Sequence, residues 1–268
     1  MKNNNVVGNE LPETKKEGVQ IQSVARALDI IKCFADEPEL GISDISEKMG
    51  LGKSTVYGLV NTLVNYGYLE QGIRHKKYRL GISLFELGNL VLSRIDVRNE
   101  TKDACMPLAK KYKATVHIAS HSRGEVIYID KIDLSDSLIS SSSVGRRAPM
   151  YCTGVGKVML AYLPKEYLQN YVLNHPLRKL TKNTITTEKK LLEELKTVRD
   201  TGIAIDNEEI ETGLTCIAAP IFKRDGDIEL AVSLSFPFNK IKDVDQDEVK
   251  ENLLACTRNI SARLGYKG

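Results

Sequence analysis

The chain has 268 residues, of which 42% are hydrophobic and 27% charged, and its net charge is +3. This size allows one or two domains with hydrophobic cores, and the composition is ordinary for a soluble globular protein. No uninterrupted run of about 18 apolar residues occurs, so no membrane-spanning helix is expected. The five cysteines are scattered and form no CxxC pair. They favour a reducing cytoplasm over a disulfide framework or a structural zinc site.

The N-terminal part predicts a flexible tail followed by a small helical domain over residues 20–81. Residues 1–19 are polar and lack the apolar core of a signal peptide. Helices are expected over residues 23–36, 43–50 and 53–66, with Ser23 and Ser43 as the N-caps of the first two. The first helix has one apolar stripe that we expect to be buried. This stripe consists of Val24, Ala27, Leu28, Ile31, Phe34 and Ala35.

The third expected helix has two unlike faces. Its apolar face consists of Val56, Leu59, Val60, Leu63 and Val64. Its opposite face carries Ser54, Gly58 and Asn61, flanked by Thr55, Tyr57 and Thr62. Small polar residues let a helix approach DNA closely, where hydroxyls reach phosphates and an asparagine can read a base edge.

An alternating ribbon follows at residues 68–71 and 77–80, closed by a basic tip at residues 72–76. Residues 20–81 carry eight cations and seven anions, yet four of the cations lie within residues 74–79. Without the ribbon, the helices would fit any small bundle with a solvated face. With it, their order is that of a winged helix-turn-helix, which places one helix in the major groove of DNA. The expected DNA contacts are Arg26, Lys53, Ser54, Thr55, Tyr57, Asn61, Arg74, Lys76 and Lys77.

Residues 82–98 predict a connecting helix that is strongly apolar. Its apolar positions are Leu84, Leu87, Leu90, Val91 and Ile95. These residues could pack against the preceding domain, or they could pair two protomers. Pairing is favoured, because palindromic half-sites need a dimer whose recognition helices lie about 34 Å apart.

From residue 99 to 268 the pattern becomes that of an α+β domain with a mainly antiparallel sheet. Strands are expected at residues 114–120, 125–131, 138–144, 202–206, 215–223 and 228–236. Helices are expected at residues 100–113, 154–163, 164–174, 187–201 and 245–264.

Two segments of this domain carry polar groups suited to binding a small molecule. Gly154 and Gly156 open a helix, whose free N–H groups and dipole favour an anion, although such glycines often only make a turn. Asp206 belongs to an acidic segment that could equally be a solvated loop. Ser233 and Ser235 alternate along a strand, so both side chains lie on one face.

Three stretches resemble the IclR family of bacterial transcriptional regulators: IQSVARALDIIKCFAD from residue 21, ISDISEKMGLGKSTVYGLVNTLVNYGYLE from residue 42, and KKYRLG from residue 76. The resemblance covers about residues 20–266. It implies a linker helix that pairs protomers and a GAF/PAS-like sensor domain with an effector pocket. Family members often carry arginine after the aromatic residue or histidine of the recognition helix, whereas here Gly58 follows Tyr57.

The family's effector-pocket positions fall on specific residues of this chain. They are Gly154, Val155, Asp206, Cys216, Ser233 and Ser235, with Met150 and Leu214 as apolar lining. The resemblance thus predicts a cytoplasmic repressor of a small catabolic operon. We expect it to bind a palindromic double-stranded operator as a homodimer or dimer of dimers, and to respond to a small organic acid without any cofactor.

The sequence gives little support for metal binding or for catalysis. His117 and His121 have the spacing of a helical metal pair, but on a strand such residues lie ~13 Å apart, so no metal site is expected. The sequence contains neither a nucleophile elbow nor a phosphate-binding loop. The alternative of a ligand-processing enzyme domain fused to a DNA-binding module is therefore disfavoured.

Overall fold

The computed structural model describes residues 20–72, 76–93, 98–134 and 143–268, which belong to two compact units divided between residues 96 and 97. The expected tail, the wing-tip residues Arg74 and His75, and the linker residue Ile95 lie outside the described residues. No helix of the described part has the length and apolar character needed to cross a membrane.

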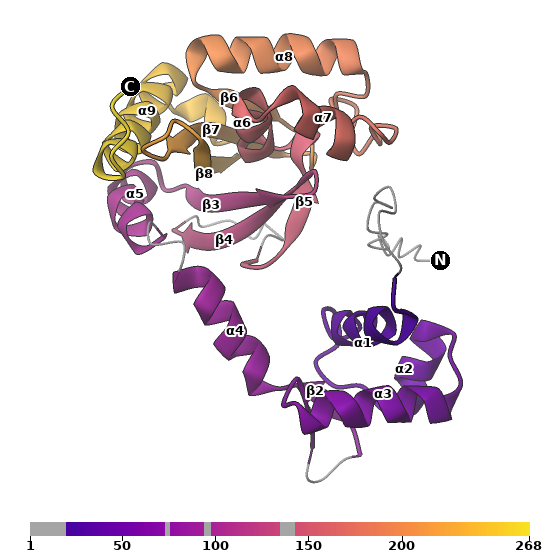
Figure 1. Cartoon of the computed structure of the whole chain (residues 1–268). Helices are drawn as coiled ribbons and strands as arrows, with labels where there is room; N and C mark the ends of the chain where they lie inside the picture. The colour runs from indigo at the N-terminus through magenta and orange to yellow at the C-terminus, as the bar shows by residue number, and fades with distance from the viewer. Residues whose placement is uncertain (1–19, 73–75, 94–97, 135–142) are drawn as a thin grey trace. The chain divides into compact units, whose positions relative to one another are not determined.

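The N-terminal unit is a winged helix-turn-helix followed by a helix (Figure 1). Its elements are α1 (Gln22–Lys32), α2 (Ile42–Met49), α3 (Lys53–Asn65), β1 (Leu69–Gln71), β2 (Tyr78–Leu80) and α4 (Ile82–Ser93). The strands β1 and β2 pair antiparallel as the expected ribbon. Leu40 exchanges two backbone hydrogen bonds with Tyr78, of 2.8 and 3.0 Å, and so attaches the α1–α2 connection to this ribbon.

The core of this unit lies between α1, α2, α3 and the ribbon. Its buried residues are Ile30, Phe34, Leu40, Ile45, Val56, Val60, Leu63, Leu69 and Tyr78. The prediction for α1 was wrong in detail, because Val24 and Leu28 are 53% and 54% exposed while Ile30 is fully buried. Ile30 lies in the last turn of α1 and Phe34 lies two residues after its end, so both enter the core from the C-terminal end of this helix.

The predicted N-caps were also wrong. Ser23 lies inside α1, whose N-cap is Ile21 with no side-chain capping bond. Ser43 lies inside α2, whose N-cap is Gly41. The Asp44 carboxylate accepts the amide hydrogen of Gly41 at 2.8 Å, so a carboxylate in the first turn caps the helix from within.

The C-terminal unit is built on one antiparallel sheet, as predicted. Its helical elements are α5 (Arg98–Tyr112), η1 (Met150–Cys152), α6 (Gly154–Tyr162), α7 (Lys165–Tyr171), α8 (Glu188–Thr201), η2 (Ile241–Asp243) and α9 (Gln246–Arg263). Its strands are β3 (Thr115–Ser122), β4 (Glu125–Asp133), β5 (Arg147–Pro149), β6 (Ala204–Asn207), β7 (Leu214–Phe222) and β8 (Ile228–Pro237). The order across the sheet is β5-β4-β3-β8-β7-β6.

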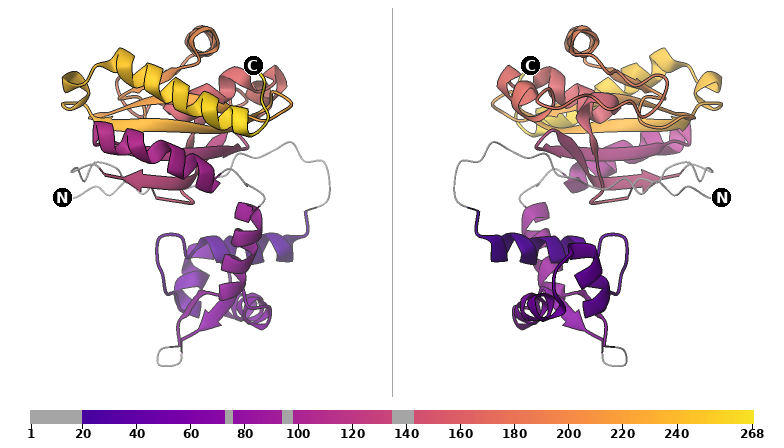
Figure 2. Two further views of the ribbon diagram at one scale, coloured as in Figure 1. Left: turned by 90° about the vertical axis from the view of Figure 1, so that its left-hand side faces the viewer. Right: turned by 90° about the vertical axis from the view of Figure 1, so that its right-hand side faces the viewer.

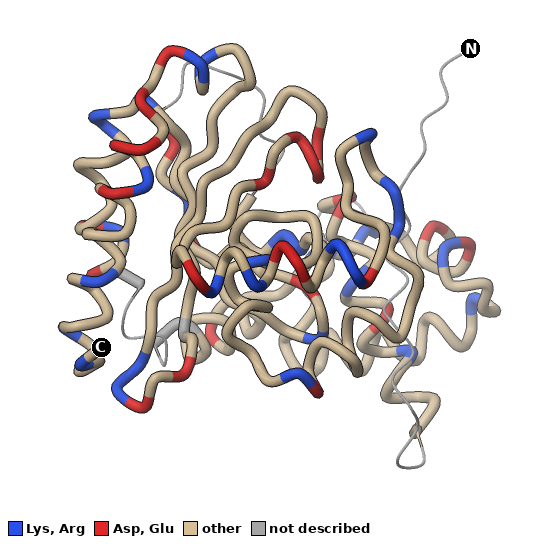
Figure 3. Tube along the Cα trace, turned by 90° about the horizontal axis from the view of Figure 1, so that it is seen from above, with Lys and Arg blue, Asp and Glu red and all other residues tan. Residues whose placement is uncertain are grey.

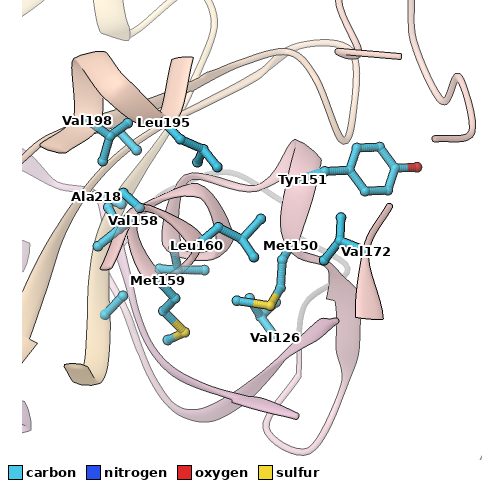
Figure 4. Packing of buried hydrophobic residues seen from close by; sticks show 14 of the residues in the cluster. Val126, Met150, Tyr151, Val158, Met159, Leu160, Val172, Leu195, Val198 and Ala218 are labelled. Carbon is cyan, nitrogen blue, oxygen red and sulfur yellow. The ribbon is translucent and has the colours of Figure 1, made fainter. Parts of the chain in front are cut away.

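The two faces of the sheet are covered by different helices (Figure 2). Helices α5 and α9 lie side by side on one face, and α9 carries acidic and basic residues along its length (Figure 3). On the other face, α6 packs against β7 and β8 and is itself covered by α8. Figure 4 shows this second core, in which Met150, Met159 and Leu160 pack with Val158 and Leu195.

One predicted strand is not observed in the described residues. Of the expected strand at residues 138–144, only Ser143 and Val144 are described, and neither belongs to a strand. The strand β5 and the short helix η1 were not predicted. They occupy the segment before α6, where three residues each are too few to give a periodic pattern.

Candidate functional site

The exposed face of α3 carries the polar residues expected to meet DNA. Lys53, Ser54, Thr55, Tyr57 and Asn61 are all exposed, and the opposite face is buried in the core. A Cβ atom added at Gly58 would meet no atom within 4 Å, so the centre of this face is open. The hydroxyl of Thr62 donates to the Gly58 carbonyl at 2.9 Å and is therefore used within the helix.

The wing adds positive charge next to this helix in the same unit. Lys76 and Lys77 are exposed, whereas the predicted contact Arg74 lies outside the described residues. Arg79 is paired with Glu70 across the ribbon at 3.0 Å, so its charge is balanced within the wing. Arg26, on α1, is partly buried.

In the C-terminal unit, a row of polar side chains crosses the sheet on the face that α6 covers. Strand register pairs Asp206 with Cys216, Cys216 with Ser235, and Ser235 with Thr115. Directly paired residues of antiparallel strands point to the same face, so these four side chains are neighbours. All four are buried. The sheet thus assembles three predicted effector residues that are up to 29 positions apart in the chain.

The side chain of His117 lies next to this row, and the sequence did not predict it as a site residue. It pairs with Ser233 in the next row, and its Nδ1 lies 3.1 Å from Ser235 Oγ. Ser235 Oγ in turn donates to Cys216 Sγ at 3.2 Å. Burial and the nearby Lys131 lower the pKa of His117 to about 4, so the imidazole is neutral at pH 7. His121 instead contacts the Tyr167 hydroxyl at 3.1 Å, so the two histidines have different partners.

The start of α6 faces this row and packs closely against it at its glycines. A Cβ on Gly154 would lie 3.2 Å from the Ala218 side chain and 3.6 Å from that of Cys216. A Cβ on Gly156 would collide with the Met150 carbonyl. The Gly156 amide donates to the hydroxyl of the N-cap Thr153 at 3.2 Å. The expectation that this amide serves an anion is therefore wrong.

The remaining predicted positions surround the same place. The amides of Gly154 and Val155 stay at the start of α6, where the helix dipole favours negative charge. Met150 and Val155 are buried, and Leu214 at the beginning of β7 is partly exposed. The structure therefore brings Gly154 together with the sheet row, and the apolar residues flank it.

Asp206 is a buried carboxyl group with one unsatisfied oxygen. Its Oδ1 accepts the amide hydrogen of Glu209 at 2.7 Å, while Oδ2 has no hydrogen-bond partner among the described residues. Burial raises the pKa of Asp206 to about 7, against the opposing effect of the Glu209 amide. Burial also raises the pKa of the Cys216 thiol, so this cysteine is a neutral neighbour. A buried acceptor of this kind is suited to a donor group supplied by a ligand.

Lys157 binds the segment around Asp206 to α6, and the sequence did not predict it as a site residue. Its ammonium donates to the Glu209 carboxylate at 2.5 Å, to the Glu194 carboxylate at 2.8 Å and to the Ile205 carbonyl at 2.6 Å. Burial opposes the charge, but the two carboxylates outweigh it and raise the pKa of Lys157. The signal in the sequence was a lone lysine within an otherwise apolar helix.

Comparison with known proteins gives matches along almost the whole chain. The model of the IclR helix-turn-helix domain matches residues 23–72, and that of the bacterial transcriptional regulator IclR C-terminal region matches residues 89–262. The HTH-type transcriptional regulator KdgR of Escherichia coli K12 is 34% identical over 251 residues, which cover 94% of this chain and 95% of KdgR.

Solved structures show the same fold. The crystal structure of the Thermotoga maritima IclR has a TM-score of 0.71 and 32% identity, over 91% of this chain and 99% of that one. An IclR homologue from Microbacterium hydrocarbonoxydans, crystallised in complex with 4-hydroxybenzoate, has a TM-score of 0.79 and 25% identity, over 90% and 98% of the two chains.

Proposed function

The chain belongs to the IclR family of bacterial transcriptional regulators, and from this premise we propose that it binds a palindromic operator and releases it in response to a small organic acid. As a member of this family it is a DNA-binding transcriptional regulator and not an enzyme. The observation that carries the proposal of an effector is the buried row of Asp206, Cys216 and Ser235 in front of the start of α6.

We assign operator contacts to the exposed face of α3 and to the wing. Tyr57 and Asn61 read the major groove, while Lys53, Lys76 and Lys77 neutralise phosphates. The exposure of these side chains supports the assignment, because base and phosphate contacts need groups that are not used within the fold. We assign phosphate contacts to the other expected DNA-binding residues as well, which are Arg26, Ser54, Thr55 and Arg74.

The effector we infer is a carboxylate that also carries a hydroxyl or keto group. Its carboxylate lies at the amides of Gly154 and Val155, where the helix start offsets negative charge. Its hydroxyl end meets Asp206, whose free oxygen accepts a hydrogen bond. The hydroxyls of Ser233 and Ser235 contact it between these ends. The compound bound to the Microbacterium hydrocarbonoxydans homologue, 4-hydroxybenzoate, has both kinds of group.

Regulation then follows from two states of the oligomer. We propose that residues 82–98 pair protomers, residues 20–81 bind DNA and residues 99–268 bind the effector. The exposed apolar side chains of α4, including Phe85, Leu87 and Val91, support this pairing. An effector can release DNA only if it binds the DNA-free arrangement of the protein more tightly than the DNA-bound arrangement. In this scheme the protein represses transcription in the cytoplasm, and the effector relieves repression.

The experiment is a thermal-shift screen of hydroxy, keto and aromatic acids, 4-hydroxybenzoate among them, followed by calorimetry of each hit. The variant Ser233→Ala with Ser235→Ala should lose the effector response and keep operator binding. The variant Ser120→Ala with Ser122→Ala, two partly exposed serines of β3, is the matched control. Undiminished affinity of the first variant for the hit would place the effector elsewhere.

A further inference from the structure

The helices α5 and α9 bring two cysteines into contact on the sheet face opposite the α6 site (Figure 2). The Sγ atoms of Cys105 and Cys256 lie 3.8 Å apart. A disulfide bond has an S–S distance of about 2.05 Å, so the gap that must close is about 1.8 Å. The Cys256 thiol also donates a hydrogen bond to the Ala104 carbonyl at 3.4 Å.

The two thiols differ in exposure and in pKa. Cys105 is fully buried, and Cys256 is partly exposed. The hydrogen bond from the Cys105 thiol lowers the pKa of Cys256 against the opposing effect of burial, and Arg263 contributes to the lowering. The same hydrogen bond, together with burial, raises the pKa of Cys105. Cys256 is therefore the more accessible and more acidic thiol, and Cys105 is the buried, less acidic thiol next to it.

We propose that Cys105 and Cys256 form an oxidation site that reacts with a hydroperoxide and closes to a reversible disulfide. With hydrogen peroxide, the Cys256 thiol gives up its proton and the resulting thiolate attacks one peroxide oxygen, the O–O bond breaks, and the leaving oxygen takes up that proton to become water. The Cys105 sulfur then attacks the sulfenic sulfur of Cys256, the S–O bond breaks, and the departing hydroxide takes the Cys105 proton. Two thiols are oxidised to one disulfide, and hydrogen peroxide is reduced to two waters.

The other cysteines of the chain serve as internal controls. Cys33 is partly buried, and burial raises the pKa of its thiol. Cys152 and Cys216 are buried, and burial likewise raises the pKa of each. Because the thiolate is the reacting form, we expect these three residues to react slowly with peroxide.

The disulfide would join residues 151 positions apart and so close most of the C-terminal unit into one loop. Such a bond restricts the unfolded chain strongly, because the entropy that a cross-link removes from the unfolded state grows with loop length. Oxidised protein should therefore unfold at a temperature higher by several degrees, and a dithiol reductant should return it to the original value.

The test treats the full chain with hydrogen peroxide, blocks free thiols with iodoacetamide and digests with trypsin in the absence of reductant. Cleavage at the flanking basic residues gives peptides 103–110 and 251–258, each with one cysteine. Mass spectrometry should find these two peptides linked in a monomeric band of a non-reducing gel, and separated again after reduction. Cys152 and Cys216 should be recovered alkylated after denaturation.

Two variants separate the roles of the thiols. In Cys105→Ser, Cys256 should pass on to the sulfinic acid because no resolving thiol is present. In Cys256→Ser, which changes the more exposed member, Cys105 should remain unoxidised. The proposal is overturned if wild-type protein gives no linked peptide while Cys256 is recovered as thiol or sulfinic acid. It is also overturned if Cys256 links to Cys33 as often as to Cys105.

Discussion

Lys157 and Glu209 form a buried ion pair that joins the first turn of α6 to the loop after β6. The Lys157 ammonium also binds the carbonyl of Ile205, so it contacts residues on both sides of Asp206. The amide of Glu209 then holds the Asp206 carboxylate at 2.7 Å. The position of Asp206 in front of the α6 start therefore depends on Lys157, which binds residues on both sides of it in the chain.

The variant Lys157→Met should lower the free energy of unfolding by about 3–5 kcal/mol, because it leaves the Glu209 carboxylate buried without its partner. Urea unfolding measures this loss. Glu194→Gln is the control, since Glu194 is the more exposed partner and its loss should cost under about 1 kcal/mol. Adding Glu209→Gln to Lys157→Met should recover part of the stability. A loss below about 1 kcal/mol for Lys157→Met would refute the role given to this pair.

Substituting the wing cations should weaken operator binding for all sequences and reduce its dependence on salt. Each phosphate contact that is lost lowers the slope of log affinity against log salt by about 0.9. The triple variant Arg74→Ala, Lys76→Ala, Lys77→Ala is measured by fluorescence anisotropy at several salt concentrations. Asn61→Ala should instead change discrimination at one base pair by about 1–3 kcal/mol with the salt slope retained. An unchanged slope in the triple variant would remove the wing from the DNA contacts.

Gly58→Ala should stabilise the N-terminal unit by up to about 1 kcal/mol, because alanine favours a helix and the added Cβ meets open space. Gly156→Ala is the opposing case, since its Cβ would collide with the Met150 carbonyl. Thermal unfolding of the two variants should shift in opposite directions. Gly58→Arg should also fold and should increase affinity for DNA through an added cation on the exposed face of α3. Destabilisation by Gly58→Ala would show that this face is not open.

The exposed apolar face of α4 should be covered by another protomer. Leu87 and Val91 are 46% and 61% exposed in the single chain. Leu87→Asp or Val91→Asp would place a carboxylate in that interface and should reduce both association and operator affinity. Sedimentation velocity reports the oligomer, and near-UV circular dichroism checks that the C-terminal unit remains folded. The exposed, polar position Asn89 offers Asn89→Asp as the control. An intact oligomer with either substitution would exclude pairing through α4.

His117 should make the free energy of unfolding depend on pH. The folded protein keeps this imidazole neutral down to about pH 4, whereas the unfolded chain protonates it near 6.5. Its contribution is therefore fully present above pH 6.5 and is lost as the pH falls toward 4, by about 2–3 kcal/mol at pH 4.5. Urea unfolding of wild type and His117→Asn at pH 7.5 and 4.5 measures the difference. His175→Asn, at an exposed histidine, is the control. Parallel losses in all three proteins would contradict the prediction.

The sequence alone determined the order of the elements in the DNA-binding unit. Helical period, the glycine turn after α2 and the short ribbon are all local features. The turn needs Gly50, whose φ of +61° suits glycine, and the second and third helices lie within two residues of their predicted ends. The cap prediction failed for α2 because its N-cap is Gly41, whose amide hydrogen is accepted by the carboxylate of Asp44 in the first turn.

The tertiary structure decided which side chains meet. Alternation placed Ser233 and Ser235 on one strand face, but only the register of β3, β7 and β8 put His117 beside them and Cys216 in contact with Ser235. Glu194, one partner of Lys157, is 37 positions away from it in the chain, and Cys256 is 151 positions away from Cys105. Periodicity reports which face of an element is buried, whereas the neighbours on that face depend on sheet order and helix packing, which are set by the whole chain at once.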